Sequence, residues 1–171
     1  MSKLKIITEP DPILRTKSSS LEKVDSEIRA LLDNMLKTMY DAPGIGLAAN
    51  QVGILKRLIV MDCSTDDEDP NLIKMINPEI IFSSTEISEL EEGCLSIPEH
   101  KSIVKRPSNI KVKFLNIEGL EEIIDAEGLL SACIQHEIDH LNGVLFVDHI
   151  SRLKRDIILR KVKKQIRENE K

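Results

Sequence analysis

The segment "QHEIDHLNG", residues 135–143, carries two histidines four positions apart and a glutamate directly after the first of them. On a helix, His136 and His140 lie on one face, one turn apart, where they can hold a metal ion. Glu137 is then placed to act on a water at that metal. Burying these three groups is costly unless they are paired or metal-bound, so a buried helix favours a metal site over a chance match.

The residues around this motif indicate that its helix is buried. The helix is expected to begin near Glu127, to run to about Leu141 and to end at Gly143, which suits the position after a helix. Apolar side chains cover most of its circumference: Leu129, Leu130, Ala132, Cys133, Ile134, Ile138 and Leu141. A helix that is apolar nearly all round packs at the centre of a protein, so the other elements have to surround it.

Two further helices are expected, one early in the chain and one at its end. After Asp25, apolar residues recur at intervals of three and four as far as Met39, which predicts an amphipathic helix that ends before Pro43. A last helix begins at Ser151, which is a good N-cap, and extends to near the C-terminus.

Strand patterns fill much of the remaining chain. They occupy residues 55–63, 72–82, 86–90 and 109–117, and a hairpin turns near Gly119. Because helices and strands do not alternate strictly, the order indicates an α+β fold of short, mostly antiparallel strands in small sheets around the buried helix. We expect residues 1–150 to form a single catalytic domain. Residues 151–171 are expected to form a basic helix that packs on this domain or extends from it.

A catalytic metal site on the central helix needs a third protein ligand, and two cysteines are candidates. Cys133 shares the face of both histidines, but it lies about 10 Å from His140 along the helix axis. That is too far for one ion whose bonds are about 2.0–2.3 Å long, so Cys133 is expected to line the site instead. Cys94 in "EEGCLSIPE" comes from another segment and is the predicted third ligand, with a buried free cysteine as the alternative.

The cysteine content and the N-terminal sequence indicate a cytoplasmic protein. Three cysteines are too few for a disulfide framework, and Cys63 is expected in the core. The chain has no run of about 18 apolar residues, and its first segment lacks the apolar stretch of a secretory signal. No membrane contact is expected.

The predicted ligands indicate amide hydrolysis. A Cys–His–His set leaves a coordination position for water, whose pKa then falls toward neutrality, and Glu137 can pass its proton to a leaving amine. The reaction also needs a donor for the oxyanion of the tetrahedral intermediate. Gln51 in "GIGLAANQVG" has a suitable amide, although a tight turn leading into a strand also explains that segment. The glycine spacing does not match a phosphate-binding loop.

Three segments, "GIGLAANQ", "EGCLS" and "QHEIDHLNG", resemble the signature motifs of the peptide deformylase family, of the bacterial and organellar type (type 1), in the same order. The resemblance implies a hydrolase that removes the N-formyl group from the initiator methionine of nascent polypeptides and releases formate. It also implies that Cys94, His136 and His140 bind the metal. In the family this metal is usually Fe²⁺, and Zn²⁺, Ni²⁺ or Co²⁺ can replace it.

The resemblance implies roles for further residues. Glu137 would be the general acid and base, and Gln51 and the backbone N–H of Leu95 would donate hydrogen bonds to the formyl oxygen. The substrate would lie extended beside the first motif, like an added strand. The residues implied in substrate binding are Ile45, Gly46, Leu90, Gly93, Leu129, Ala132 and Cys133, and plain core packing is the alternative for the pocket residues among them. Lys101 stands where the family more often has arginine, and it lacks arginine's planar fork for gripping a carboxylate.

The charge is divided unevenly along the chain. Residues 151–171 hold nine Lys or Arg and three Asp or Glu, a net charge of +6, whereas residues 1–150 carry −11. The resemblance implies that this basic helix docks on the ribosome near the exit tunnel. The alternative is an amphipathic helix that is simply solvated on its basic side. No contact with DNA is expected.

Two other functions stay open on the residues alone. One is another metal-dependent amidase or peptidase, although peptidases on such a helix more often use His₂Glu or His₃ ligands. The other is a metal-stabilised scaffold that is held on the ribosome by its basic helix. Formate release from a formylated peptide would separate a deformylase from both.

Overall fold

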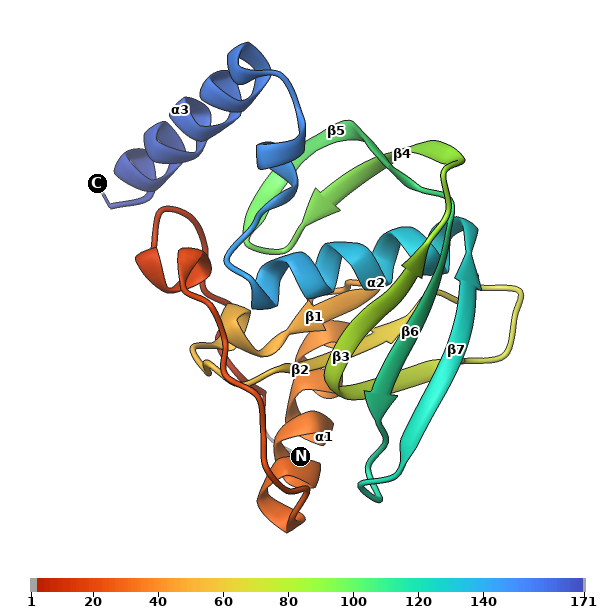
Figure 1. Cartoon of the computed structure of the whole chain (residues 1–171). Coiled ribbons are helices and arrows are strands. Elements are labelled where there is room, and N and C mark those ends of the chain that lie inside the picture. Colours follow the sequence, from red (N-terminus) through yellow and green to blue (C-terminus); the bar gives the residue numbers. More distant parts are fainter. Residues whose placement is uncertain (1–2, 171) are drawn as a thin grey trace.

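The computed structural model describes residues 3–170, and these residues form an α+β fold (Figure 1). The α-helices are α1 (Ser26–Asp41), α2 (Gly128–Leu141) and α3 (Arg152–Asn169), and the short 3₁₀ helices are η1 (Pro12–Arg15), η2 (Ala49–Val52) and η3 (Phe146–His149). The strands are β1 (Gly46–Ala48), β2 (Leu58–Asp62), β3 (Leu72–Ser83), β4 (Ile87–Cys94), β5 (Ile97–Pro107), β6 (Asn109–Leu115) and β7 (Glu121–Glu127). One antiparallel sheet has the order β1-β2-β3-β6-β7, and β4 pairs with β5 in a second sheet. The expected fold class is confirmed.

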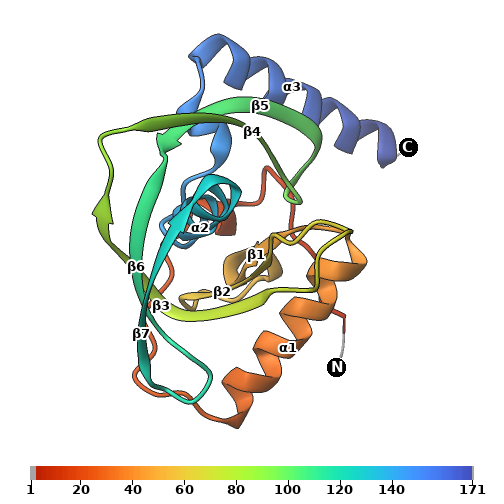
Figure 2. The same cartoon turned by 90° about the vertical axis from the view of Figure 1, so that its right-hand side faces the viewer.

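The central helix of the fold is α2, which carries the H-E-x-x-H motif. Figure 2 shows it end-on, with the five-stranded sheet on one side and the β4–β5 hairpin on the other. Ten of its fourteen residues are buried, as the apolar sequence around the motif predicted. Its end is also confirmed, because Gly143 follows with a φ of 77°, a left-handed value that favours glycine.

α1 covers the opposite face of the five-stranded sheet. β2 is therefore buried at every position, since its two faces meet different helices. Leu58 and Val60 belong to the core under α1, whereas Ile59 and Met61 belong to the core under α2. The alternation follows from the two-residue period of a strand. Asp25 is the N-cap of α1, and its carboxylate accepts a backbone N–H of the first turn.

Strand β5 was not predicted from the sequence. The strand pattern was expected to end at residue 90, but β4 continues to Cys94 and β5 follows at once from Ile97. β5 lacks a clean alternation of apolar and polar residues, because Arg106 is buried while Ile103 is 52% exposed. The hairpin matters for the site, since it carries Cys94 to the surface of α2.

α3 packs against β5 and η3 through one apolar face (Figure 1). Its N-cap is Ser151, as expected, and Ile158 and Val162 are buried in a core that also contains Ile97 and Phe146. The other basic side chains of this helix are exposed, whereas Arg155 Nε lies 3.5 Å from Asp148 Oδ1 of η3. Among residues 3–170, no helix is long and apolar enough to cross a membrane.

Candidate active site

Three possible metal ligands converge between α2 and the end of β4. Cys94 Sγ lies 3.2 Å from His140 Nε2, and His140 Nε2 lies 3.1 Å from His136 Nε2. The three ligand atoms all lie within 4.8 Å of one another. The α-helix places both histidines on one face, and the β4–β5 turn supplies the sulfur from about forty residues upstream.

The geometry and chemistry of this donor set fit a divalent metal ion. Tetrahedral coordination with bonds of about 2.0–2.3 Å separates ligand atoms by about 3.3–3.8 Å, close to the two separations found here. Burial lowers the pKa of His140 well below its usual value, which keeps the imidazole neutral and able to coordinate. Thiolate and imidazole together suit zinc, iron and nickel, so the donors alone do not select one ion.

The other nitrogen of His136 is held by a buried ion-pair network. His136 Nδ1 lies 2.9 Å from Glu92 Oε1, and Arg106 donates to both oxygens of Glu92 and to Asp139. Burial alone would raise the pKa of Glu92, but its bonds to His136 and Arg106 outweigh burial and lower that pKa to about 2. A carboxylate behind a ligating histidine fixes the orientation of the ring. No sequence pattern predicted this network, although Glu92 stands two residues before Cys94, a strand spacing that favours a shared face.

Glu137 has a buried carboxylate beside the donor set. Its Oε1 accepts no hydrogen bond from any of residues 3–170. Burial raises the pKa of Glu137 to about 7, while His136 opposes the rise and Glu92 adds to it. Gly46 allows this placement, because a Cβ there would overlap Glu137 Oε2 and lie 3.0 Å from Cys133 Sγ. An acid whose pKa is near neutral can both accept and release a proton.

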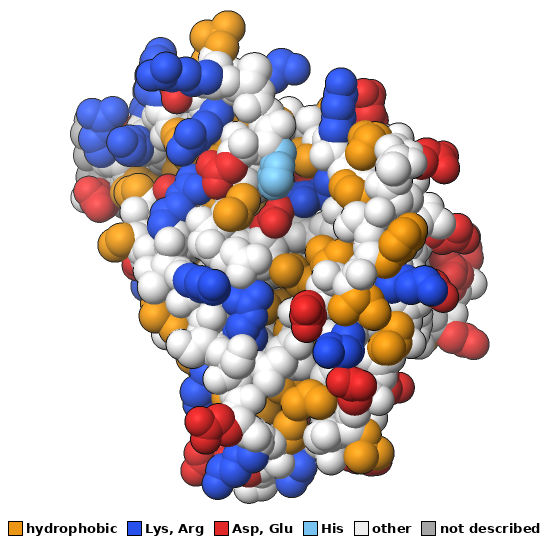
Figure 3. Space-filling view, viewed as in Figure 1, with side chains coloured by type: hydrophobic (Ala, Val, Ile, Leu, Met, Phe, Trp, Pro, Cys, Tyr) orange, Lys and Arg blue, Asp and Glu red, His pale blue; other side chains and the backbone are white. Residues whose placement is uncertain are grey.

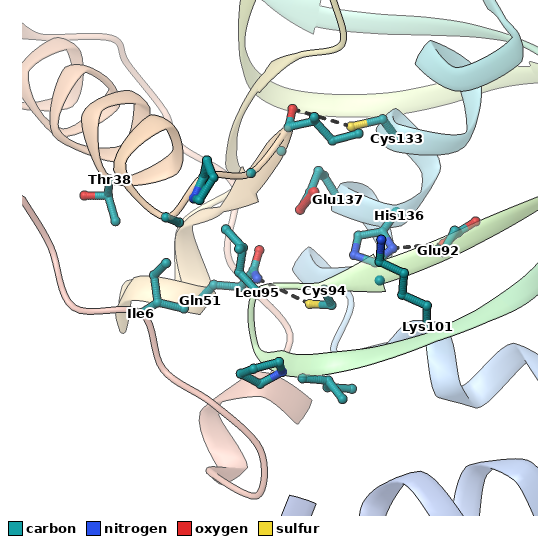
Figure 4. Close-up of a pocket in the computed structure, with 18 of the residues that line it drawn as sticks. Ile6, Thr38, Gln51, Glu92, Cys94, Leu95, Lys101, Cys133, His136 and Glu137 are labelled. Atoms are coloured by element: carbon teal, nitrogen blue, oxygen red, sulfur yellow. Dashed lines mark hydrogen bonds and ion pairs between the residues drawn. The ribbon is translucent and has the colours of Figure 1, made fainter. Parts of the chain in front are cut away.

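Gln51 lies on η2 with its carboxamide next to Cys94. Its Oε1 accepts the backbone N–H of Ala48 at 2.9 Å, and its Nε2 lies 3.1 Å from Ser96 Oγ. The Nε2 also lies 3.5 Å from Cys94 Sγ (Figure 4). The side chain is only 1% exposed, so the carboxamide is a fixed donor at the edge of the site. Leu95 follows Cys94 directly, and its side chain faces Gly44.

A pocket of about 880 Å³ opens beside these groups. It is lined by every residue expected in the site except the fully buried His140, namely Ile45, Gly46, Gln51, Leu90, Gly93, Cys94, Leu95, Leu129, Ala132, Cys133, His136 and Glu137. Of these lining residues, Leu129 and Ile45 are half-exposed, whereas Ala132 is buried. Residues 3–6 also line the pocket, which the sequence analysis did not suggest.

The cysteines other than Cys94 lie away from the donor set. Figure 4 shows Cys133 apart from Cys94, and its Sγ faces the carbonyl oxygen of Ile45 at 3.9 Å. Cys133 is thus part of the pocket wall, where the helix geometry had placed it. Cys63 packs against the core around α2, as expected.

Metal-dependent hydrolases combine such a cluster of donors with a buried acid facing a substrate pocket, and the fold and site put this chain in that class. The family model described as polypeptide deformylase matches residues 3–156. The chain therefore belongs to the peptide deformylase family, as its three motifs had indicated.

Known members of the family are similar over nearly the whole chain. Peptide deformylases of Agrobacterium fabrum and Rhizobium meliloti are 51% and 54% identical to it, over 95% and 93% of this chain and 95% and 91% of theirs. The crystal structure of peptide deformylase from Ehrlichia chaffeensis matches with a TM-score of 0.95 at 44% identity, covering 99% of this chain and 100% of that one. A structure of the Ehrlichia chaffeensis enzyme in complex with actinonin has a TM-score of 0.92 at 46% identity, covering 96% of this chain and 98% of that one.

The function follows from this membership. The chain is a metal-dependent hydrolase that removes the N-formyl group from the initiator methionine of nascent polypeptides and releases formate. The general peptidase and the scaffold, which the residues alone had left open, are thereby set aside.

Proposed function

We propose that Cys94, His136 and His140 hold one divalent ion and that this ion is Fe²⁺ in the native protein, with Zn²⁺, Ni²⁺ or Co²⁺ able to replace it. The convergence of the three ligand atoms within 4.8 Å carries this proposal. When bound, the ion polarises the formyl carbonyl and lowers the pKa of the attacking water. The choice of Fe²⁺ is supported by the resemblance of the three motifs and not by the donors themselves.

The proposed roles of the surrounding residues follow from their donors and acceptors. Glu137 takes a proton from the attacking water and delivers it to the departing amine, for which a pKa of about 7 is well matched. The Nε2 of Gln51 and the backbone N–H of Leu95 donate to the formyl oxygen as it gains negative charge. Glu92 holds the ring of His136 in place throughout.

The proposed substrate path runs along β1. The peptide lies extended beside Ile45 and Gly46, with Gly93 on its other side, and backbone hydrogen bonds hold it as an added strand. The methionine side chain enters the pocket between Leu90, Leu129, Ala132 and Cys133, whose apolar surfaces suit an unbranched thioether.

Removal of the metal tests the proposed site directly. Protein purified without oxygen and loaded with Fe²⁺ is expected to release formate from formyl-Met-Ala-Ser. Chelation should abolish the release, and added Fe²⁺ should restore it, because hydrogen bonds to the formyl oxygen do not lower the pKa of the attacking water as the ion does. The metal content of the anaerobically isolated protein is measured by mass spectrometry. Formate release that survives chelation would contradict the metal site, and a content of zinc without iron would contradict only the choice of ion.

We also propose that residues 1–150 are the catalytic domain and that residues 151–171, which include α3, dock this domain on the ribosome. Figure 3 shows Lys and Arg side chains gathered over α3, at the upper left of the molecule. The exposed basic residues of α3 are Arg152, Lys154, Arg160, Lys161, Lys163, Lys164 and Arg167. Such a basic face suits the phosphates of RNA. Action on nascent chains at the ribosome also supports a cytoplasmic location.

Charge reversal on α3 is expected to weaken ribosome binding by about tenfold or more while formate release from a short peptide stays within about twofold. The variant replaces Arg160, Lys161 and Lys164 with glutamate. Deleting the helix is a poorer test, because the buried Ile158 and Val162 belong to a core shared with β5. Binding is measured by co-sedimentation with purified ribosomes at fixed salt.

The matched control makes the same change in charge on exposed lysines elsewhere, at Lys17, Lys23 and Lys56. If both triple variants bind ribosomes equally well, α3 has no special part in docking. A loss confined to the α3 variant supports the proposal.

A further inference from the structure

Ser96 lies behind the donor set, between Gln51 and the N-terminal segment, and it is 0% exposed. We propose that Ser96 is a positioning residue that holds the Gln51 carboxamide with an N–H, and not its oxygen, facing the reacting formyl group. The inference rests on the donor role proposed above for Gln51. Ser96 affects the reaction only through the orientation of the Gln51 carboxamide.

The direction of each hydrogen bond around Ser96 supports this assignment. The Ser96 hydroxyl has one proton, and it donates that proton to the carbonyl oxygen of Ile7 at 2.7 Å. Toward Gln51, Ser96 Oγ can therefore only accept a hydrogen bond. The group opposite it, at 3.1 Å, has to be the Nε2 of Gln51.

The oxygen of the Gln51 carboxamide is held by a second hydrogen bond that requires the same orientation. The oxygen of Gln51 accepts the backbone N–H of Ala48 at 2.9 Å. A flipped carboxamide would place an NH₂ group against the Ala48 N–H and an oxygen against the lone pairs of Ser96, so both hydrogen bonds would be lost. In this buried place each lost bond leaves an unsatisfied polar group, which is strongly unfavourable. Because the amide is planar, the second N–H of Nε2 is left for the site, on the side of Cys94 Sγ at 3.5 Å.

Ser96 is itself held by the N-terminal segment. The backbone N–H of Glu9 donates to the Ser96 carbonyl at 2.9 Å, and the backbone N–H of Ile7 donates to the Gln51 carbonyl at 2.7 Å. The segment therefore joins the backbones of Ser96 and Gln51 and keeps the hydroxyl at a set distance from the carboxamide. This gives a structural reason for a serine at the end of the "EGCLS" motif.

The Ser96→Ala variant removes the acceptor and frees the carboxamide to rotate. We expect kcat for formate release to fall by roughly tenfold to a hundredfold with little change in KM, because the lost donor acts on the charge that develops in the transition state. Gln51→Ala is expected to lower kcat by roughly a hundredfold to a thousandfold. If Ser96 acts only through Gln51, the double variant should be no more than about twofold slower than Gln51→Ala.

Ser131 offers a matched control for the loss of a buried serine hydroxyl. It is 1% exposed, accepts a hydrogen bond from the amide of Gln135 at 3.0 Å and donates to the carbonyl of Pro107. Ser131→Ala thus removes the same pair of bonds away from the reacting groups. It is expected to lower the midpoint of thermal unfolding about as much as Ser96→Ala does while leaving kcat unchanged.

The experiment measures kcat, KM, metal content and thermal midpoint for the wild type, the three single variants and the double variant. Loss of kcat in Ser96→Ala that disappears in the Gln51→Ala background, at full metal content, supports the proposal. Suppose that Gln51→Ala is slow, and that Ser96→Ala lowers kcat equally in the wild-type and Gln51→Ala proteins or lowers it in neither. Ser96 then does not act through Gln51, and this inference fails while the donor role of Gln51 stands. If Gln51→Ala keeps the wild-type kcat, the donor role of Gln51 fails and the inference fails with it.

Discussion

Replacement of Glu137 by alanine is expected to leave the metal bound and to lower kcat for formate release by roughly 10²–10⁴-fold. Glu137 is not among the three converging ligands, so its loss leaves Cys94, His136 and His140 in place. What disappears is the buried carboxylate that lines the pocket and whose pKa rises to about 7. Metal content is measured by mass spectrometry, and kcat and KM are measured with formyl-Met-Ala-Ser.

Glu137→Gln is the matched variant, because it keeps the shape of the side chain and removes only its ability to carry a proton. It should be about as slow as Glu137→Ala and should bind metal equally well. A variant that retains the metal and more than about a tenth of the wild-type kcat would show that proton transfer does not depend on Glu137. Loss of the metal from both variants would instead make Glu137 a part of the metal site.

The central helix and its two histidines could be predicted because their signals are local. The signals for α2 all lie within one short segment: its apolar residues, the glycine that ends it and the spacing of the histidines. Such a local pattern can be recognised without knowing which elements pack around the helix. The same holds for α1, where Asp25 marks the beginning and Pro43 follows the end.

The network behind the ligands could not be predicted, because its members meet only in the folded chain. Glu92 of β4 and Arg106 of β5 form an ion pair across the hairpin although they are not opposite each other in its register, and a buried arginine hides the apolar alternation that would have revealed β5. Arg106 then joins Asp139 on α2. In the same way, the proposed role of Ser96 depends on its hydrogen bond to Ile7, which lies 89 positions away in the sequence. Ion pairs and hydroxyl hydrogen bonds between residues so far apart produce no periodic pattern in the sequence.

The choice between Cys94 and Cys133 as third ligand is where the local and the long-range evidence differ most. Cys133 shares the helix with both histidines, and sequence proximity alone favours it. The rise of the helix argues against it, and in the structure its Sγ faces the Ile45 carbonyl instead. Cys94 Sγ lies 3.2 Å from His140 Nε2 after the β4–β5 hairpin has brought it to α2.

Cys94→Ala is therefore expected to reduce metal affinity by more than about a hundredfold and to abolish formate release, whereas Cys133→Ala should keep one ion per chain. Both variants remove one thiol from the same pocket, so each is the control for the other. Cys133→Ala should change KM more than kcat, because Cys133 belongs to the pocket wall and not to the donor set. The measurements are metal content after desalting and steady-state formate release. A Cys133→Ala protein that is free of metal beside a loaded Cys94→Ala protein would reverse the assignment. Helix α2 would then have to be distorted, because a regular helix keeps Cys133 about 10 Å from His140 along its axis.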